Sequence, residues 1–389
     1  MIIDYPQIET LVKTSLAFKI HQEVLESSRL RVNSIAKSFI PEVFLYGKEE
    51  RPTVQKMGTS PSFGIFSSFN LYNGNKDVEQ NKINFLNYQI NNLEFKKNYN
   101  ELVLLAKTKY WEIIKYQEDI KILNDYNIIN KNNRILILKK VSSGLSPKSE
   151  EFIFKKIELE LQEDILKSEY ELKLLKRSLA QTLSLDKREL LELSNNLDLS
   201  TFKYDPHLTK INKEIISTQR ELSQSENKLS ALWRMPKINL YAEKSFTAEK
   251  KGEVLDENSL SEGIIGIKIT LPLISDKNND SIEEQVKKSE LAASHLRSLA
   301  FIAESEAVED NNETHFVHLL SVVDISKSKI VLSKEIFDKT FSEFKIGLKE
   351  AVSLNEATVE YIQAKKDLID HQINYILAIE QAKVNNREN

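Results

Sequence analysis

The chain has 389 residues, a formal net charge of −4 and no cysteine. This charge balance does not indicate nucleic-acid binding, and the lack of cysteine excludes disulfides, thiolate metal sites and a cysteine nucleophile. No run of 18 or more apolar residues occurs, so we expect no transmembrane helix. The start, "MIIDYPQIETL", lacks the basic and apolar regions of a signal peptide. Either the protein is cytoplasmic or a signal peptide has been removed.

The positions of glycine and proline predict the boundaries of the first structural elements. After a helical start, these residues cluster between Pro41 and Gly74. Within this window, "PEVFLYG" (41–47) and "PSFGIFSSFNLY" (61–72) are short and rich in aromatic and β-branched residues, with a charged loop between them. The window therefore predicts a β-hairpin.

Residues 75–143 contain neither glycine nor proline. Because these two residue types break helices most strongly, the stretch predicts one uninterrupted helix roughly 100 Å long. A helix of that length does not fit a compact globule. Gly144 then predicts a sharp turn, and Pro147 is expected to start a returning helix, where its missing N–H costs little.

The second half of the chain contains a second window of breakers, at 236–272. Its segments "PKINLYAEKSF" (236–246) and "GIIGIKITLPLI" (263–274) alternate in polarity, with Ile265 and Ile267 on the face opposite Gly266. They predict a second hairpin, with strands about 10 residues long, which is the length a tilted strand needs to cross a bilayer.

The helices carry small and apolar residues at alternating spacings of three and four, which is typical of helices that pair side by side. The same spacing occurs within 103–113 and 161–182. In the last helix the predicted seam is Leu354, Ala357, Tyr361, Ala364, Leu368, His371, Tyr375, Ala378 and Ala382.

The chain also looks duplicated, with repeats at about 1–200 and 201–389. Each half runs from a helix through a hairpin to a long helix, a turn and a returning helix. The two turns, "SSGLSPKSEEF" and "FKIGLKEAVSL", share a Gly-Leu pair followed by a polar step and a new helix.

With this layout the chain resembles the TolC-like outer membrane efflux proteins, the exit ducts of tripartite pumps and type I secretion systems. The resemblance covers essentially the whole chain and rests on "SIAKSFIPEVFLYG", "FNLYNG", "LPLISD" and the two turns. It implies a mainly α fold with a small β part. Three chains would each give four strands, from about 41–72 and 236–274, to one 12-stranded β-barrel. Their helices, 75–200 and 277–389, would form an α-helical barrel.

The resemblance further implies a homotrimer in the outer membrane of a Gram-negative bacterium, in contact with its lipid and extending into the periplasm. It would be a passive duct that works with a periplasmic adaptor (membrane fusion protein) and an inner membrane transporter. No nucleic acid, cofactor or metal is implied. No catalytic motif occurs in the sequence, so we do not expect an enzyme.

The turns are the candidate opening of the duct. The resemblance places them at the periplasmic tip, where they would meet the adaptor. The turn residues are Gly144, Leu145, Pro147, Gly347 and Leu348.

The family pattern suggests a latch that holds the tip closed. Its residues here are Glu150 after the first turn, with Phe344 before and Lys349 after the second glycine. We expect Lys349 and Glu150 to pair. The alternative is that both are solvated turn residues, because exposed pairs contribute little on average.

Family members often carry two acidic residues facing the lumen after the second turn. Here those positions are Ser353 and Glu356, so half of the pattern is missing. Glu356 is either a single three-fold ring of carboxylates or an exposed helical glutamate. His315 and His318 are spaced like metal ligands but lack a third strong ligand, which favours a solvated face.

Aromatic residues on the strands are candidates for interfacial girdles, and others are expected to pack between strands and helices. The girdle role is assigned to Phe69 and Tyr72, which sit at the strand-to-helix junction. The full set is Phe44, Tyr46, Phe63, Phe66, Phe69, Tyr72, Tyr241 and Phe246.

Two other interpretations are compatible with the sequence. One is a non-enzymatic soluble coiled-coil scaffold in which both breaker-rich windows are loops. The other is a periplasmic hairpin adaptor, although adaptors carry Gly- and Val-rich domains that this chain lacks.

Overall fold

The computed structural model describes residues 2–33, 40–50, 60–186, 192–193, 199, 202, 210–247, 250–251, 254–255, 260–272 and 279–384. The chain divides into two compact units. The sheet unit comprises Glu23–Glu94 and Lys213–Ile302. The helical unit comprises Met1–Gln22, Phe95–Asn212 and Ala303–Asn389. Each unit therefore combines segments from both halves of the sequence.

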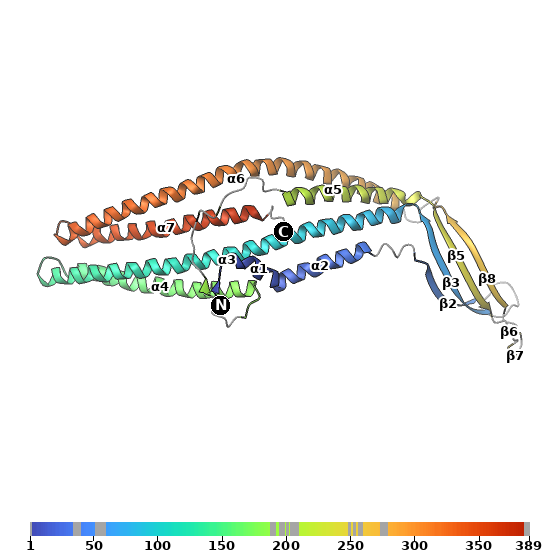
Figure 1. Cartoon of the computed structure of the whole chain (residues 1–389), viewed down its shortest axis with the longest axis horizontal. Helices are drawn as coiled ribbons and strands as arrows, with labels where there is room; N and C mark the ends of the chain where they lie inside the picture. The colour runs from blue at the N-terminus through green and yellow to red at the C-terminus, as the bar shows by residue number, and fades with distance from the viewer. Residues whose placement is uncertain are drawn as a thin grey trace. The chain divides into compact units, whose positions relative to one another are not determined.

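Four strands form the antiparallel sheet of the sheet unit, in the order β2-β3-β5-β8 (Figure 1). They span β2 Glu42–Glu50, β3 Ser60–Asn73, β5 Lys237–Thr247 and β8 Leu260–Thr270. Both predicted hairpins are confirmed, and the β3–β5 pairing joins them into one sheet.

One detail of the strand predictions was wrong. The fourth strand was expected to continue to residue 274, but it ends at Thr270, two residues before Pro272. A proline has no N–H for the ladder, which explains the early end. Between β5 and β8 lie the two-residue strands β6 (Lys250–Lys251) and β7 (Val254–Leu255), which pair with each other.

Helices α3 (Lys76–Ser142) and α6 (Asn279–Lys345) begin in the sheet unit and continue in the helical unit. Each has 67 residues, so the predicted long helix over 75–143 is confirmed almost to the residue. The sheet unit also contains most of α2 (Leu16–Asn33) and α5 (Lys210–Ala231), followed by the short η3 (Leu232–Arg234).

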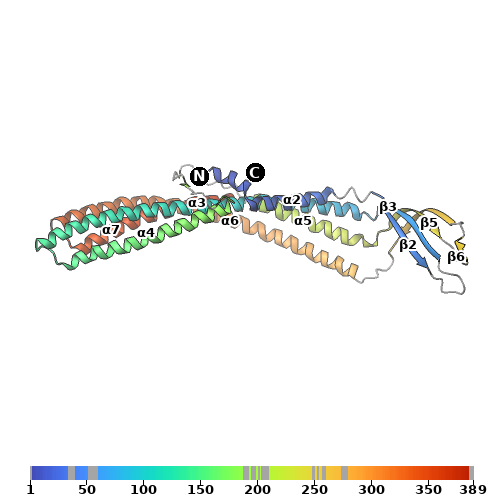
Figure 2. The same ribbon diagram turned by 90° about the horizontal axis from the view of Figure 1, so that it is seen from below.

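In the helical unit, α4 (Ser149–Thr182) returns along α3, and α7 (Ala351–Lys383) returns along α6 (Figures 1 and 2). The N-terminal part adds α1 (Gln7–Thr14) and strand β1 (Ile2–Ile3), which pairs in parallel with β4 (Glu192–Leu193). The predicted repeat boundary at 200–201 and the junction after Pro272 lie outside the described residues.

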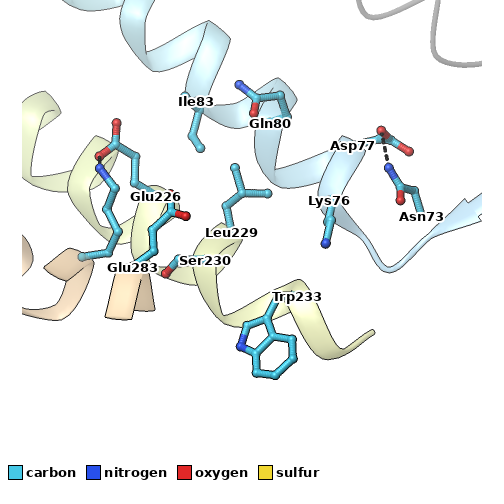
Figure 3. A pocket seen from close by; sticks show the side chains of 11 residues that line it. Asn73, Lys76, Asp77, Gln80, Ile83, Glu226, Leu229, Ser230, Trp233 and Glu283 are labelled. Carbon is cyan, nitrogen blue, oxygen red and sulfur yellow. Dashed lines mark hydrogen bonds and ion pairs between the residues drawn. The ribbon is translucent and has the colours of Figure 1, made fainter. Parts of the chain in front are cut away.

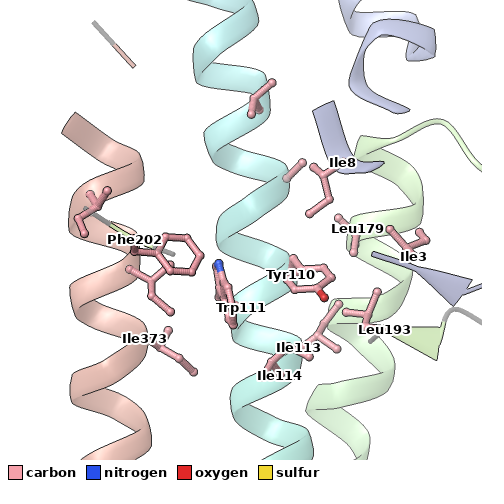
Figure 4. Close-up of a cluster of buried hydrophobic side chains, with 14 of the residues drawn as sticks. Ile3, Ile8, Tyr110, Trp111, Ile113, Ile114, Leu179, Leu193, Phe202 and Ile373 are labelled. Atoms are coloured by element: carbon pink, nitrogen blue, oxygen red, sulfur yellow. The ribbon is translucent and has the colours of Figure 1, made fainter. Parts of the chain in front are cut away.

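The largest core of the helical unit surrounds Trp111 and Tyr110 of α3 (Figure 4). Trp111 faces Ile373 of α7 and also Phe202, which lies outside the helices. Its ring packs edge-on to the Phe202 ring, with 5.9 Å between the two centroids. A second apolar cluster, toward the turns, includes Phe154 and Phe344. Burying these aromatic rings stabilises pairs of helices that are too polar elsewhere to form a thick core.

The predicted seam of α7 holds only in part. Leu354, Ala357, Ala364 and Tyr375 are buried as expected, and partly buried side chains pack against the core at Leu368, Ala378 and Ala382. Ile373 and Ile376, outside the predicted seam, are also buried, whereas His371 is only half-buried. A straight helix has 3.6 residues per turn, so a 3.5-residue seam drifts around it.

A buried ion-pair network joins the ends of the chain to α3. The ammonium of Lys107 lies 2.7 Å from Glu380 of α7 and 2.9 Å from Glu9 of α1. Lys107 and Glu380 are 2% and 3% exposed, and Lys383 also contacts Glu380, at 2.8 Å. Pairing of this quality is required for charges to be tolerated away from water.

Candidate functional site

The two turns of the helical unit, which we call the tip turns (143–148 and 346–350), have the same backbone structure. In the first, Gly144 has φ of +72° and its N–H bonds to Val141, while the Leu145 N–H bonds to Lys140. This pair of backbone hydrogen bonds is the Schellman motif, which requires a residue with left-handed backbone and therefore favours glycine.

The second tip turn repeats this pattern. Gly347 has φ of +85°, its N–H bonds to Phe344, and the Leu348 N–H bonds to Glu343. The predicted Gly-Leu signature thus corresponds to one backbone motif used twice. Leu145 and Leu348 are both strongly exposed.

Pro147 does not begin the returning helix as predicted. Helix α4 begins at Ser149, and the Pro147 carbonyl accepts a hydrogen bond from the Glu150 N–H. Proline therefore sits just ahead of the first turn, where its fixed φ still directs the chain into the helix.

The contact that joins the two tip turns was not found from sequence. Lys140 of α3 donates a hydrogen bond to the backbone carbonyl of Phe344 in α6. Its ammonium also lies 4.0 Å from the centroid of the Phe344 ring. Phe344, predicted as a latch residue, is almost fully buried in the second apolar cluster.

Other polar contacts hold the helices near the tip. Arg134 of α3 pairs with Glu158 at 3.0 Å and with Glu151 at 3.5 Å, both on α4. The Tyr126 hydroxyl of α3 donates to Asn355 of α7 at 3.2 Å. Burial raises the pKa of Tyr126 to about 12, with Glu160 adding to the shift, so the hydroxyl stays a donor at any ordinary pH.

The remaining predicted tip residues lie at the surface of the single chain. Lys349 and Glu356 are exposed, and Glu150 and Ser353 are half-buried. In the part of the chain that the structure describes, the ion pairs of this region involve Arg134 and do not join Glu150 to Lys349. The pairing of Glu150 with Lys349 therefore stays a prediction, and it concerns contacts between copies of the chain.

The four-stranded sheet has one face, the apolar face, on which strand pairing aligns apolar side chains. Leu45 and Ile265 on this face are 83% and 81% exposed. The residues aligned there are Val43, Leu45, Phe63, Ile65, Ser67, Phe69, Tyr72, Ile238, Leu240, Ala242, Lys244, Phe246, Ile265, Ile267 and Ile269. An exposed apolar surface of this extent is unusual for a protein surface in water.

A register shift in β3 brings both girdle candidates onto the apolar face. Asn70 pairs with Asn239 and Tyr72 with Ile238, so Leu71 is an extra residue between them. Without this bulge, strand alternation would place Phe69 and Tyr72 on opposite faces. Of the other aromatic candidates, Phe63 and Phe246 share this face, whereas Phe44, Tyr46, Phe66 and Tyr241 lie on the opposite, polar face.

A cavity of about 540 Å³ lies where the strands of the sheet unit meet its helices (Figure 3). Lys76 of α3, Trp233 of η3 and Glu283 of α6 approach it from three elements. The ion pair between Lys287 and Glu226, at 3.0 Å, closes one side. Its lining mixes charges of both signs with an indole ring.

His315 and His318 are both exposed on α6. Among the described side chains, no group of three or more His, Cys, Asp or Glu residues is placed to hold a metal ion. Among the described helices, none combines the length and apolar character needed to span a bilayer.

Solved structures match the chain over nearly its whole length. A structure of CusC, described in connection with transmembrane channel formation, gives a TM-score of 0.85 at 11% identity and covers 98% of this chain and 92% of that one. The outer-membrane channel OprN gives 0.83 at 12%, covering 98% and 90%. The outer membrane protein VceC from Vibrio cholerae gives 0.82 at 11%, covering 98% and 96%. No protein-family model matches the chain, and no curated protein matches its sequence.

The chain has the fold of the TolC-like outer membrane channels. This confirms the predicted fold class, with long helical hairpins and two β-hairpins in one chain.

Proposed function

We propose that three copies of this chain form a passive exit duct through the outer membrane of a Gram-negative bacterium. The duct would work with a periplasmic adaptor and an inner membrane transporter, with the helical unit in the periplasm. The four strands of each chain would supply a third of a 12-stranded barrel, and the tip turns would form the opening that the adaptor meets.

The apolar face of the sheet is the observation that carries this proposal. Several large apolar side chains on this face are exposed although they would gain free energy by leaving water, at about 25 cal/mol per Å² of buried apolar area. They are Phe63, Ile65, Ile265, Ile267 and Ile269. Lipid on this face and water on the polar face would satisfy both sides of the sheet.

The edges of the sheet support association of several copies. β2 and β8 are the outer strands, and each pairs with only one neighbour among the described strands. An open strand edge is not tolerated in lipid, because its N–H and C=O groups cannot be hydrogen-bonded there. Pairing of β2 with β8 of the next copy would close the barrel. In the helical unit, Ile325 and Val331 of α6 and Leu166 of α4 are exposed and suit contacts between copies.

We further propose that the halves 1–200 and 201–389 are structural repeats, since both carry a hairpin, a 67-residue helix and a Schellman turn. In the assembled duct, Glu150 and Lys349 would form the latch between copies, and Glu356 would line the lumen as a single ring. Phe69 and Tyr72 would mark the periplasmic edge of the membrane.

Reconstitution in a planar lipid bilayer tests the duct. The protein should insert and give stable conductance steps. Ile267→Lys, on the apolar face, should reduce insertion strongly, because a lysine at mid-membrane costs about 2–4 kcal/mol. Ser68→Lys, on the polar face of β3, is the matched control and should insert normally. Equal insertion of the two variants, or no conductance from folded wild-type protein, would refute the proposal.

The two alternative readings are less well supported. A soluble scaffold needs both breaker-rich windows to be loops, whereas the structure has paired strands in both. For an adaptor role, the matching structures speak in the other direction, since they include outer membrane channels.

A further inference from the structure

The polar face of the sheet carries a run of stacked aromatic rings across three strands. Phe44 of β2 and Phe66 of β3 are direct cross-strand partners, with ring centroids 6.4 Å apart and planes inclined by 24°. Phe66 and Tyr241 of β5 lie 6.2 Å apart at 21°. We call these three residues and Tyr46 the aromatic platform.

Glycines on neighbouring strands let the two tyrosines lie flat. Tyr46 is paired with Gly64, and Tyr241 with Gly266. A Cβ added at Gly64 would lie 3.0 Å from the Tyr46 ring, and one at Gly266 would lie 2.7 Å from the Tyr241 ring. Both rings therefore occupy the space above a glycine. The same pairing of a tyrosine with a cross-strand glycine thus occurs in both hairpins.

Charged groups border the platform on two sides. Glu243 is directly across from Phe66, and its carboxylate accepts a hydrogen bond from the Tyr46 hydroxyl. Lys268 lies two residues beyond Gly266 on the same face. The rings between these charges are half-buried or exposed, and Phe44 is 50% exposed. The platform thus places partly exposed aromatic rings between one acidic and one basic side chain.

We propose that the aromatic platform is a stacking surface for planar aromatic cargo. Partly exposed aromatic rings attract other planar rings, and Glu243 and Lys268 would accept a charged substituent of either sign. This inference rests on the proposed function, because only a closed barrel would place the polar face of the sheet inside the duct. Rings that merely shield glycines and stabilise the sheet would have no affinity for such molecules.

Equilibrium binding to the purified full chain in detergent tests the platform. Two fluorescent probes are titrated, ethidium as a planar cation and pyrenesulfonate as a planar anion, and anisotropy is recorded. Both should bind the wild type. Phe66→Leu keeps an apolar side chain but removes the central ring, so it should weaken both probes about three- to tenfold. Phe44→Leu provides a second variant if the first does not fold.

The matched control is Phe63→Leu, which removes a ring stacked on Phe246 at 5.4 Å on the apolar face of the same sheet. It should leave both affinities unchanged. No binding to folded wild type, unchanged binding to both platform variants, or equal weakening by Phe63→Leu would overturn the platform. Weakening of only one probe would overturn stacking in favour of charge recognition. Because binding needs no conductance, this result is independent of the bilayer test of the duct.

Discussion

Lys140 of α3 holds Phe344 of α6 by two contacts, although the residues are 204 positions apart in the sequence. The lysine donates a hydrogen bond to the Phe344 carbonyl, and its ammonium faces the Phe344 ring at 4.0 Å. The carbonyl belongs to the last turn of α6, where a positive charge is favoured by the helix dipole. One side chain thus joins the ends of α3 and α6 that lead into the two tip turns, within a single chain.

Replacing Lys140 should loosen the tip. Lys140→Met keeps the aliphatic stem but removes the hydrogen bond and the cation–π contact, at a cost of about 1–2 kcal/mol. Hydrogen exchange of the Gly347 and Leu348 amides should become about tenfold faster. Lys139→Met, on an exposed neighbour, is the control and should not change exchange. Similar exchange in the two variants would show that Lys140 does not hold the tip.

The buried network at Lys107 should dominate the stability of the helical unit. Lys107→Met leaves Glu380 buried with a weaker set of partners and should lower the free energy of unfolding by about 3 kcal/mol. Lys115→Met breaks a pair with Asp370 whose side chains are more than one-third exposed, and it should cost less than about 1 kcal/mol. Urea unfolding is followed by the fluorescence of Trp111 in a Trp233→Phe background. Equal losses in the two variants would contradict this ranking.

Glu380 should make the helical unit sensitive to acid. Burial acts to raise the pKa of Glu380, but the Lys107 ammonium and Lys383 outweigh it, so the pKa lies below its usual value of 4.5. A lowered pKa contributes stability above pH 4.5, which is lost as the pH falls through the folded-state value.

The matched variant for this effect is Glu380→Gln. It should be less stable than the wild type at pH 7, and the difference should shrink as the pH falls below about 4.5. Urea midpoints measured between pH 7 and pH 3 check this. A difference that stays constant over this range would mean that the carboxylate charge contributes nothing.

Gly74 should be the least replaceable glycine of the sheet unit. It has φ of +62°, and an added Cβ would lie 2.5 Å from the Cβ of Met235. Gly74→Ala should therefore cost more than the roughly 1–2 kcal/mol of a left-handed alanine alone. Gly47→Ala, where an added Cβ meets nothing within 4 Å, should be nearly neutral. Equal thermal midpoints for the two variants would count against this view of the strand-to-helix junction.

The sequence predicts this fold well where the chemistry is local. Gly144 and Gly347 identify the tip turns because glycine tolerates left-handed backbone, and the lack of breakers over 75–143 marks α3 almost to its ends. Lys140 escapes prediction because it is an ordinary helical lysine and its partner is a backbone carbonyl, which every residue carries. The aromatic platform depends on strand register, since Tyr241 meets Gly266 only once β5 and β8 are aligned.

Closure of the barrel by three copies is the central claim, and disulfide cross-linking tests it most directly. The chain has no cysteine, so introduced thiols are the only ones present. Leu45→Cys in β2 is combined in turn with cysteine at Gly263, Ile265, Ile267 or Ile269 of β8. After oxidation in outer membranes, at least one pair should give a covalent ladder on a denaturing gel that stops at three chains. Monomers at every position, or a ladder that continues beyond three chains, would contradict a closed trimer.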